Sequence, residues 1–387
     1  MKSLERLRTV PWTALTGLED ALGPALDEVL CGKPADRVLD RLLRKNRTAT
    51  AEQRTALAEA IFGVGLWRRR LGTGTGLTLL RRLIDGHPEP TSFADRFSLP
   101  DWLAQTIQEA LGAEAEAFAD ALNLPGPICL RANTVRISRD ALALRLADEG
   151  VQTVPGRFAR DCLVITSSRP NLYGLQAWNE ALFEVQDEGS QLLGDLLDAQ
   201  PGDEVLDLCA GAGGKALQLA AQLKNQGRVH ATDVDLARLE RLRTRATRAG
   251  ATCINIHGRT LPPDLRVCRI LVDAPCSELG ALRRGPDLRW RLDPSAFAPM
   301  PATQRALLET ALHHLSPGGR LVYATCTFRP EENEQVIAGF ELSHPELQRV
   351  PPPLLEEQGA LRTWPHRHGT DAFFATVHTL SKSNVGL

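Results

Sequence analysis

The chain has 387 residues, of which 43% are hydrophobic and 24% are charged, and its formal net charge at pH 7 is -2. This composition is typical of a soluble globular protein, and the length allows two or three domains with sizeable cores. No apolar run reaches the roughly 20 residues that a membrane span needs, and the opening MKSLERLRTVPW lacks the apolar stretch of a signal peptide. We therefore expect a cytoplasmic protein without membrane association.

The first 190 residues show two kinds of pattern. Leu, Ala and Arg recur at helical spacing over residues 1–90, which predicts a helical domain. Residues 91–124 continue as a helical linker, in which Pro100 and Asp101 begin a helix. Residues 125–190 contain short β-rich pieces separated by turn residues, and these predict a small α+β module.

The basic residues are mostly arginines, and they are clustered in runs at residues 41–47, 67–71, 238–248 and 283–291. Arginine suits phosphate groups and stacks on bases. A single run of this kind is more often a solvated helix face. With a net charge of -2, the arginines alone do not identify a nucleic-acid-binding protein.

From about residue 200 onward, short apolar strands alternate with helices, which predicts an α/β fold with a parallel sheet covered by helices on both faces. We assign residues 191–387 to this domain. Ligands of such sheets bind at the carboxyl ends of the strands. Four polar residues lie near predicted strand ends: Asp207, Asp233, Asp273 and Cys326. The sequence therefore predicts a site at this edge of the sheet.

The glycine loop DLCAGAGGK, residues 207–215, matches neither common phosphate-binding pattern. A Walker loop fails because Cys209 replaces the first glycine and Ala216 the final Ser or Thr, and the loop also lacks the G-x-G-x-x-G spacing of a dinucleotide fold. Its small residues still let a ligand approach the backbone at a helix start. Asp207 suits a cationic amine and Asp233 the two hydroxyls of a ribose. These features predict S-adenosylmethionine, and the alternative is a glycine-rich turn with two capping aspartates.

The eight cysteines contain no C-x-x-C pair, so neither a disulfide framework nor a zinc site is indicated, and we expect no metal. Cys162 and Cys253 have apolar neighbours typical of small buried side chains. Cys326 differs, because it stands where an apolar run at residues 321–324 gives way to a charged loop.

Several motifs follow one another in a fixed order: LRANT, VQDEGSQL, DLCAGAGGK, DAPCS, a PD..W pattern, SPGGRLVYATCT, EENEQVI and DAFF. With them the chain resembles, over nearly its whole length, the bacterial 16S rRNA cytosine-C5 methyltransferases of the Sun/Fmu type, also called RsmB. The resemblance implies a Rossmann-like class I methyltransferase domain at residues 191–387. It also implies a NusB-like RNA-binding domain at residues 1–90 and an RNA-binding role for the module at residues 125–190.

The chemistry of that family explains the residue types. Carbon 5 of cytosine is a weak nucleophile, and a thiolate that adds to carbon 6 produces an enamine whose carbon 5 can attack a methyl sulfonium. By resemblance Cys326 attacks, Cys276 assists release, Asp273 acts near ring nitrogen 3, and Lys215 lies at the mouth of the site. The residues expected to bind S-adenosylmethionine are Asp207, Cys209, Ala210, Gly211, Ala212, Gly213, Gly214, Lys215, Asp233 and Asp273.

The identity of the nucleophile has an alternative. DNA cytosine methyltransferases use the cysteine of a Pro-Cys pair, which would be Cys276 in this chain, whereas the RNA family uses the Thr-Cys cysteine, which would be Cys326. The surrounding residues resemble the RNA family, so we assign the attack to Cys326.

Three positions depart from the family pattern. The glycine loop has Gly211-Ala212 where Ala-Pro is common, and Ala372 replaces a glycine. At INIHGR, His257 or Gly258 occupies the place of an aspartate expected to contact the adenine amino group. This change puts cofactor affinity or the local loop shape in question.

Three functions remain open at this point. The favoured one is methylation of ribosomal RNA by a monomeric enzyme, with tRNA as the alternative RNA. The second is a catalytically impaired RNA-binding ribosome assembly factor on the same scaffold, suggested by the change at His257. A small-molecule methyltransferase explains neither the two cysteines nor the N-terminal domain.

Overall fold

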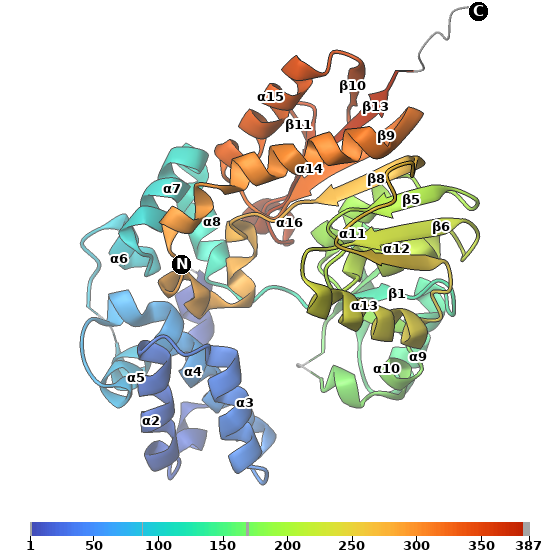
Figure 1. The fold of residues 1–387 in the computed structure, drawn as a ribbon. Coiled ribbons are helices and arrows are strands. Elements are labelled where there is room, and N and C mark those ends of the chain that lie inside the picture. Colours follow the sequence, from blue (N-terminus) through green and yellow to red (C-terminus); the bar gives the residue numbers. More distant parts are fainter. Residues whose placement is uncertain (1, 87, 168–169, 382–387) are drawn as a thin grey trace, which may run out of the picture. The chain divides into compact units, whose positions relative to one another are not determined.

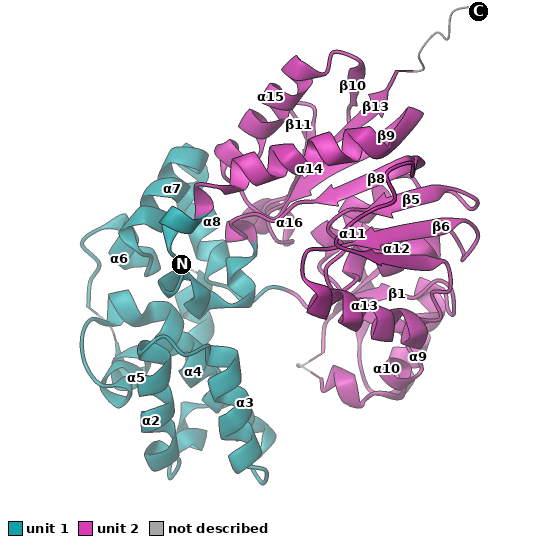
Figure 2. Cartoon of the chain, viewed as in Figure 1, with its two compact units in different colours: residues 1–126, 281–296 teal, residues 127–280, 297–387 magenta. Residues whose placement is uncertain are grey.

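The computed structural model describes residues 2–86, 88–167 and 170–381. It divides into two compact units, residues 1–126 with 281–296 and residues 127–280 with 297–387 (Figure 2). Within the described ranges, no helix combines the length and the apolar character needed to cross a membrane.

The first unit is helical (Figure 1). Its helices are α1 (Lys2–Glu5), α2 (Glu19–Leu30), α3 (Ala35–Lys45), α4 (Ala51–Leu71), α5 (Gly76–Asp85), α6 (Phe93–Phe97), α7 (Asp101–Leu111) and α8 (Ala115–Leu122). Helix α4 begins with a capping box, in which Thr50 and Gln53 exchange side-chain and backbone hydrogen bonds. Helix α7 begins at Asp101 directly after Pro100, as predicted. The fully buried Trp67 of α4 lies in the core formed with α2, α3 and α5.

Residues 281–296 belong to this helical unit, although the sequence division placed them within the catalytic domain. Arg289 is fully buried and donates from Nη1 to Oδ1 of Asn123 over 2.7 Å, and the Asp287 carboxylate accepts the backbone N–H of Ala35. Burial lowers the pKa of Arg289 to about 9. These partners are more than 160 residues distant in the sequence, so no local pattern could indicate them.

The second unit begins with a small antiparallel sheet. Its strands are β1 (Cys129–Ala132), β2 (Thr153–Pro155), β3 (Cys162–Ile165) and β4 (Phe183–Val185), in the order β2-β3-β1-β4. Helices α9 (Arg139–Asp148) and α10 (Gln176–Asn179) accompany it, and Leu142, Leu146 and Phe183 are among its buried core residues. This module lies in the same compact unit as the large sheet.

Among the described residues, the large sheet has nine strands. They are β5 (Glu204–Asp207), β6 (Arg228–Thr232), β7 (Ile254–Gly258), β8 (Val267–Asp273), β9 (Leu315–Thr325), β10 (Leu347–Val350), β11 (Glu356–Glu357), β12 (Ala360–Arg362) and β13 (Phe374–Leu380). The order is β11-β12-β13-β9-β8-β5-β6-β7, with β10 paired to β13. Strands β5 to β9 are parallel, and β13 runs antiparallel to β9.

Helices cover both faces of this sheet, which confirms the predicted Rossmann-like α/β fold. They are α11 (Glu188–Asp195), α12 (Gly214–Gln222), α13 (Leu236–Ala249), α14 (Met300–His314), α15 (Glu334–Ser343) and α16 (Pro365–His368). Alternate strand residues point to opposite faces. Val205 and Leu271 pack with α11, α12 and α13, whereas Leu206 and Ile270 pack with α14 and α15.

The order of the parallel strands brings the predicted site together. Strands β9, β8, β5 and β6 are consecutive neighbours in the sheet, so their carboxyl ends lie along one edge. Asp207 and Asp273 are the last residues of β5 and β8, and Asp233 and Cys326 directly follow β6 and β9.

Candidate active site

A cavity of about 570 Å³ opens at this edge of the sheet. Its lining includes five residues predicted to belong to the site, namely Cys209, Asp233, Asp273, Cys276 and Cys326. Apolar side chains from several loops and from α14 complete the wall, among them Val234, Leu261 and Leu307. The cavity combines apolar side chains with polar groups that can orient a ligand, as small-molecule sites do.

Two cysteines from neighbouring loops meet in this cavity. The Sγ atoms of Cys276 and Cys326 lie 3.4 Å apart. Cys276 is 9% exposed, and Cys326 is half-buried. The hydrogen bond with Cys276, together with burial, raises the pKa of Cys326 well above that of an ordinary thiol. The thiol form of Cys326 is therefore favoured in the absence of a substrate.

Lys215 reaches the same place from the start of α12. Its Nζ lies 2.5 Å from Oδ2 of Asp273. Burial acts to lower the pKa of Lys215, but Asp273 and Asp207 outweigh burial and raise it above its ordinary value. Asp273 and Asp207 therefore favour the charged form of Lys215.

The glycine loop lies between β5 and α12 in a conformation that needs glycine. Gly211 and Gly213 have φ of +54° and +90°, and a Cβ on Gly213 would lie 2.2 Å from Cδ1 of Leu242. Asp233 fixes the loop, since its Oδ2 accepts the backbone N–H of Gly211 over 2.8 Å. Gly214 differs, because a Cβ there would meet no atom within 4 Å. The loop is thus tightly packed at Gly213 and open at Gly214.

Asp207 is the last residue of β5, where the glycine loop begins. It is 1% exposed, it is not among the residues that line the cavity, and neither carboxylate oxygen has a hydrogen-bond partner of normal geometry among the described residues. Burial raises the pKa of Asp207 to about 7, although nearby Lys215 acts in the opposite direction. Its expected contact with a cationic amine stays a prediction, and it would require the loop to admit the ligand.

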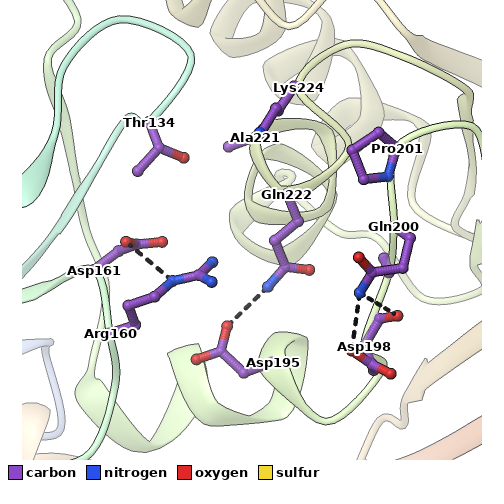
Figure 3. A pocket seen from close by; sticks show the side chains of 11 residues that line it. Thr134, Arg160, Asp161, Asp195, Asp198, Gln200, Pro201, Ala221, Gln222 and Lys224 are labelled. Carbon is purple, nitrogen blue, oxygen red and sulfur yellow. Dashed lines mark hydrogen bonds and ion pairs between the residues drawn. The ribbon is translucent and has the colours of Figure 1, made fainter.

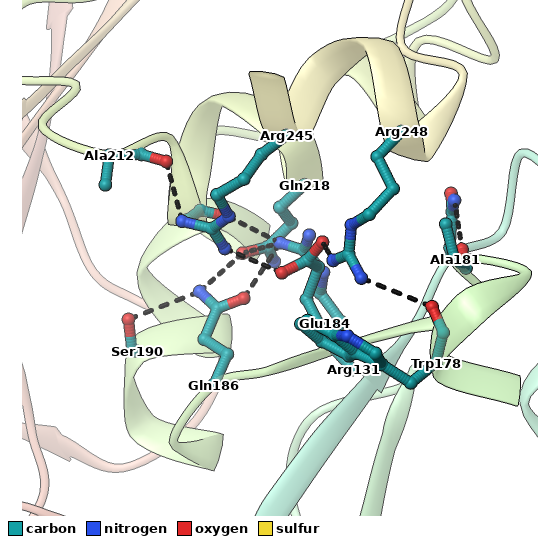
Figure 4. A network of polar contacts seen from close by, with 12 residues as sticks. Arg131, Trp178, Ala181, Glu184, Gln186, Ser190, Ala212, Gln218, Arg245 and Arg248 are labelled. Carbon is teal, nitrogen blue, oxygen red and sulfur yellow. Dashed lines mark hydrogen bonds and ion pairs between the residues drawn. The ribbon is translucent and has the colours of Figure 1, made fainter. Parts of the chain in front are cut away.

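A polar network that the sequence did not indicate holds the glycine loop from the side of the small module (Figure 4). Arg245 of α13 donates to the carbonyl oxygen of Ala212 over 2.6 Å, and Arg131 of β1 donates to that of Gly214 over 2.8 Å. The Glu184 carboxylate of β4, 4% exposed, pairs with both Arg245 and Arg248. The motif LRANT and the arginine run at 238–248 contained these arginines, but nothing in the sequence paired them with Glu184.

The departure at His257 has a structural explanation. Nε2 of His257 lies 2.7 Å from Nδ1 of His230 on the adjacent strand β6, and the two rings are stacked. His257 is not among the residues that line the cavity, whereas Arg259 and Thr260 are. The cavity wall at this position therefore presents a cation and a hydroxyl where an aspartate was expected.

A second cavity, of about 610 Å³, contains none of the predicted site residues (Figure 3). It is lined by Thr134, Arg160, Asp161, Asp195, Asp198, Ala199, Gln200, Pro201, Ala221, Gln222 and Lys224. Asp195 accepts hydrogen bonds from Gln218 and Gln222, and burial raises the pKa of Asp195 to about 6. In the part of the chain that the structure describes, no three His, Cys, Asp or Glu side chains form a group suited to a metal ion.

The sheet order, the glycine loop after β5 and the acid after β6 define a Rossmann-like methyltransferase of the class that uses S-adenosylmethionine. Comparison with known proteins narrows this class. The family model described as 16S rRNA methyltransferase RsmB/F matches residues 195–378, and the RsmF/B-like ferredoxin-like domain matches residues 99–171.

Curated relatives agree with these models. A probable ribosomal RNA small subunit methyltransferase B of Synechocystis sp. is 34% identical over 301 residues, which cover 74% of this chain and 68% of that protein. The ribosomal RNA small subunit methyltransferase B of Yersinia pseudotuberculosis is 32% identical, covering 82% of this chain and 76% of that protein. The chain belongs to the RsmB/F family of 16S rRNA methyltransferases.

Solved structures share the fold. The crystal structure of PH0851 has a TM-score of 0.79 at 26% identity and covers 96% of this chain and 99% of that chain. A methyltransferase homolog protein from Pyrococcus horikoshii has a TM-score of 0.66 at 28% identity and covers 76% of this chain and 100% of that chain. This chain spans 66–76% of the length of the curated relatives that it matches, so the activity of the whole protein is a matter for proposal.

Proposed function

We propose that the protein is an S-adenosylmethionine-dependent RNA (cytosine-C5) methyltransferase that acts on 16S ribosomal RNA in the cytoplasm through a covalent adduct of Cys326. The observation that carries the proposal is the contact between Cys276 and Cys326 over 3.4 Å, beside the Lys215–Asp273 pair. One cysteine can attack the base while the other lies close enough to act on the resulting adduct.

The residues at the cavity fit the cofactor. Asp233 keeps free lone pairs for the ribose hydroxyls although it also binds Gly211 and Asp235 through their backbone N–H groups. The open face of Gly214 leaves room for a close approach to the backbone, and Val234 and Leu261 supply apolar surface. When bound, the cofactor supplies an electrophilic methyl group on a sulfonium.

The proposed reaction gives four residues of the site separate roles. The Cys326 thiolate adds to carbon 6 of cytosine, and the bond electrons move so that carbon 5 becomes nucleophilic. Asp273, kept in place by Lys215, donates a proton to ring nitrogen 3 while negative charge develops there, and takes it back when the ring is restored. After methyl transfer, the proton on carbon 5 is removed, the carbon–sulfur bond breaks, and the aromatic ring is restored with Cys326 released. We assign assistance in that release to Cys276.

The substrate base must leave its stacked position to reach this cavity, so a single-stranded or flipped cytosine is required. The helical unit and the small α+β module are the parts that we propose to bind the RNA. The division into four domains, at residues 1–90, 91–124, 125–190 and 191–387, belongs to this proposal.

One experiment tests the function. Labelled S-adenosylmethionine is incubated with 16S rRNA and with tRNA in the presence of wild type, Cys326→Ala or Cys276→Ala. We expect label on 16S rRNA as 5-methylcytosine with wild type, none with Cys326→Ala, and a trapped RNA–protein adduct with Cys276→Ala. Label on tRNA alone would mean that tRNA is the substrate. An adduct in Cys326→Ala would mean that Cys276 attacks the base and Cys326 assists release. No label on either RNA would favour the function of an assembly factor.

A further inference from the structure

Two consecutive residues behind the cysteine pair are fully buried and polar. Glu332 ends a 3₁₀ turn (Pro330–Glu332), and Asn333 follows it directly before α15; both are 0% exposed. An ionised carboxylate is costly to bury unless hydrogen bonds compensate it. The positions of those hydrogen bonds therefore indicate what Glu332 and Asn333 do.

Glu332 holds the loop that carries Cys276. Its Oε2 accepts the backbone N–H of Ser277, the residue after Cys276, over 2.9 Å. The same oxygen accepts from Nε2 of Gln304, which also donates to the carbonyl oxygen of Pro275, the residue before Cys276. Both neighbours of Cys276 are thus tied to one buried carboxylate, directly or through Gln304.

Asn333 holds the loop that carries Cys326 in the same way. Its Nδ2 donates to the carbonyl oxygen of Thr327 over 3.0 Å, and its Oδ1 accepts from Oγ1 of Thr325 over 2.6 Å. Thr325 and Thr327 are the residues on either side of Cys326. Each cysteine therefore has both of its chain neighbours fixed by one of two consecutive buried side chains.

The two loops are also joined directly. Oγ of Ser277 and Oγ1 of Thr327 lie 2.8 Å apart, so the residues that follow the two cysteines share a buried hydrogen bond. We infer that Glu332 and Asn333 are positioning residues, which set the separation of the Cys276 and Cys326 sulfurs through the Ser277–Thr327 bridge. Glu332 acts through the Cys276 loop and Asn333 through the Cys326 loop.

This inference rests on the proposed function for its consequence in catalysis. Attack and release use two sulfurs on one base, and a misplacement of about 1 Å can cost about a hundredfold in rate. Loss of the Glu332 hydrogen bond to Ser277 should therefore slow release, and loss of the Asn333 hydrogen bond to Thr327 should slow attack.

The catalytic test compares Glu332→Met with Glu331→Met, because Met is similar in size to Glu but has no oxygen to accept from Ser277, whereas the amide oxygen of Gln could keep that hydrogen bond. Glu331 is the neighbouring carboxylate, and its side chain is 48% exposed. It shares its partner with Glu332, since Arg329 lies 3.5 Å from Glu331 and 3.3 Å from Glu332, so its variant is a matched control. In single turnovers with RNA, we expect Glu332→Met to accumulate the covalent adduct about tenfold more than wild type. Glu331→Met should behave as wild type. A uniform loss of kcat without adduct in Glu332→Met would overturn the assigned step.

Asn333→Asp tests the other loop, because Asp can still accept from Thr325 but cannot donate to Thr327. We expect adduct formation about tenfold slower than in wild type and no accumulation of adduct. Thr325→Val removes the other hydrogen bond of Asn333 and should change the rate in the same direction. If Asn333→Asp forms adduct as fast as wild type, Asn333 does not position Cys326.

A second readout needs neither RNA nor cofactor. Diamide takes up the two thiol hydrogens as Cys276 and Cys326 join in a disulfide, and the rate of this step, followed by mass spectrometry of the peptides, reports the separation of the sulfurs. We expect Glu332→Met, Asn333→Asp and the smaller change Ser277→Ala to slow it about tenfold, and Glu331→Met to leave it unchanged. Equal rates in folded variants would overturn the inference. Failure of wild type to methylate RNA would instead overturn the proposed function and leave this result unaffected.

Discussion

The Sγ atoms of Cys276 and Cys326 lie 3.4 Å apart although the two residues are separated by 50 positions in the chain. The contact follows from the sheet, because β8 and β9 are adjacent parallel strands and the two cysteines lie on the loops at their carboxyl ends. In this arrangement the hydrogen bond with Cys276 raises the pKa of Cys326.

Removal of Cys276 should make Cys326 more reactive. The hydrogen bond with Cys276 is the largest cause of the raised pKa of Cys326, so Cys276→Ala should lower that pKa and increase the thiolate fraction near pH 8. We expect alkylation of Cys326 by iodoacetamide at pH 8 to be roughly threefold faster for each unit by which the pKa falls, because the thiolate fraction rises about tenfold while the nucleophilicity of the thiolate decreases. Mass spectrometry of the alkylated peptides gives the rate.

The exposed Cys31 supplies an internal reference in the same sample, since its rate should not change. A slower or equal rate at Cys326 in Cys276→Ala would contradict the assigned cause of the raised pKa.

Gly214→Ala should separate folding from cofactor binding. A Cβ at Gly214 meets no atom of the free protein within 4 Å, so the variant should unfold at the same temperature as wild type. If the cofactor lies against this backbone, the added methyl group should cost about 1–3 kcal/mol, or roughly tenfold to a hundredfold in the Kd for S-adenosylmethionine. Isothermal titration calorimetry measures this Kd.

Gly213→Ala provides the contrast. Its φ of +90° and the 2.2 Å approach to Leu242 predict loss of stability as well as of binding. An unchanged Kd in Gly214→Ala would place the cofactor away from this part of the loop.

The fold and the outline of the site could be predicted because both depend on local patterns. The alternation of strands and helices indicated the parallel sheet, and the positions of Asp273 and Cys326 at strand ends indicated that both lie at one edge of it. The contacts of residues 281–296 with Ala35 and Asn123 depend instead on side chains that meet only after folding.

The same limit applies to Asp207. Its place at the end of β5 suggested a ligand contact. The direction in which such a side chain points depends, however, on how the glycine loop that follows β5 packs. Asp207 is 1% exposed and is not among the residues that line the cavity. His257 likewise turns to His230, a partner on the neighbouring strand that the sequence does not specify.

Arg245→Met should weaken cofactor binding from outside the cavity. The guanidinium supports the glycine loop through the carbonyl oxygen of Ala212 and is itself held by Glu184. Loss of these hydrogen bonds should destabilise the ordered conformation of the glycine loop by about 1–3 kcal/mol, and the Kd for S-adenosylmethionine should therefore rise about tenfold or more. Equilibrium binding of labelled cofactor measures the change.

Arg243→Met is the matched control, because Arg243 lies on the same helix with 61% of its side chain exposed and pairs with Glu240 over 3.4 Å. It should leave the Kd unchanged. Equal effects of the two substitutions would mean that the net charge of α13, and not the hydrogen bond to Ala212, supports binding.

Asp207→Asn should stabilise the protein at neutral and alkaline pH. Burial raises the pKa of Asp207 from 3.8 to about 7, so between these values the folded state binds more protons at this site than the unfolded state. Stability then falls as pH rises through this range and is lowest above it. An amide has no such titration, so the difference in unfolding free energy between Asp207→Asn and wild type should grow from about pH 4 to about pH 7 and then level off. Its upper limit is about 4 kcal/mol, at about 1.4 kcal/mol for each pKa unit.

Urea unfolding from about pH 2 to about pH 8 measures this difference. Asp95 provides a comparison of opposite sign, because its hydrogen bond with Arg69 lowers its pKa to about 2. Asp95→Asn should therefore be less stable than wild type at about pH 8, and this loss should diminish as the pH falls below about 4. A pH-independent difference for Asp207→Asn would mean that the Asp207 carboxylate is stabilised in the folded protein, and that its burial does not set its pKa.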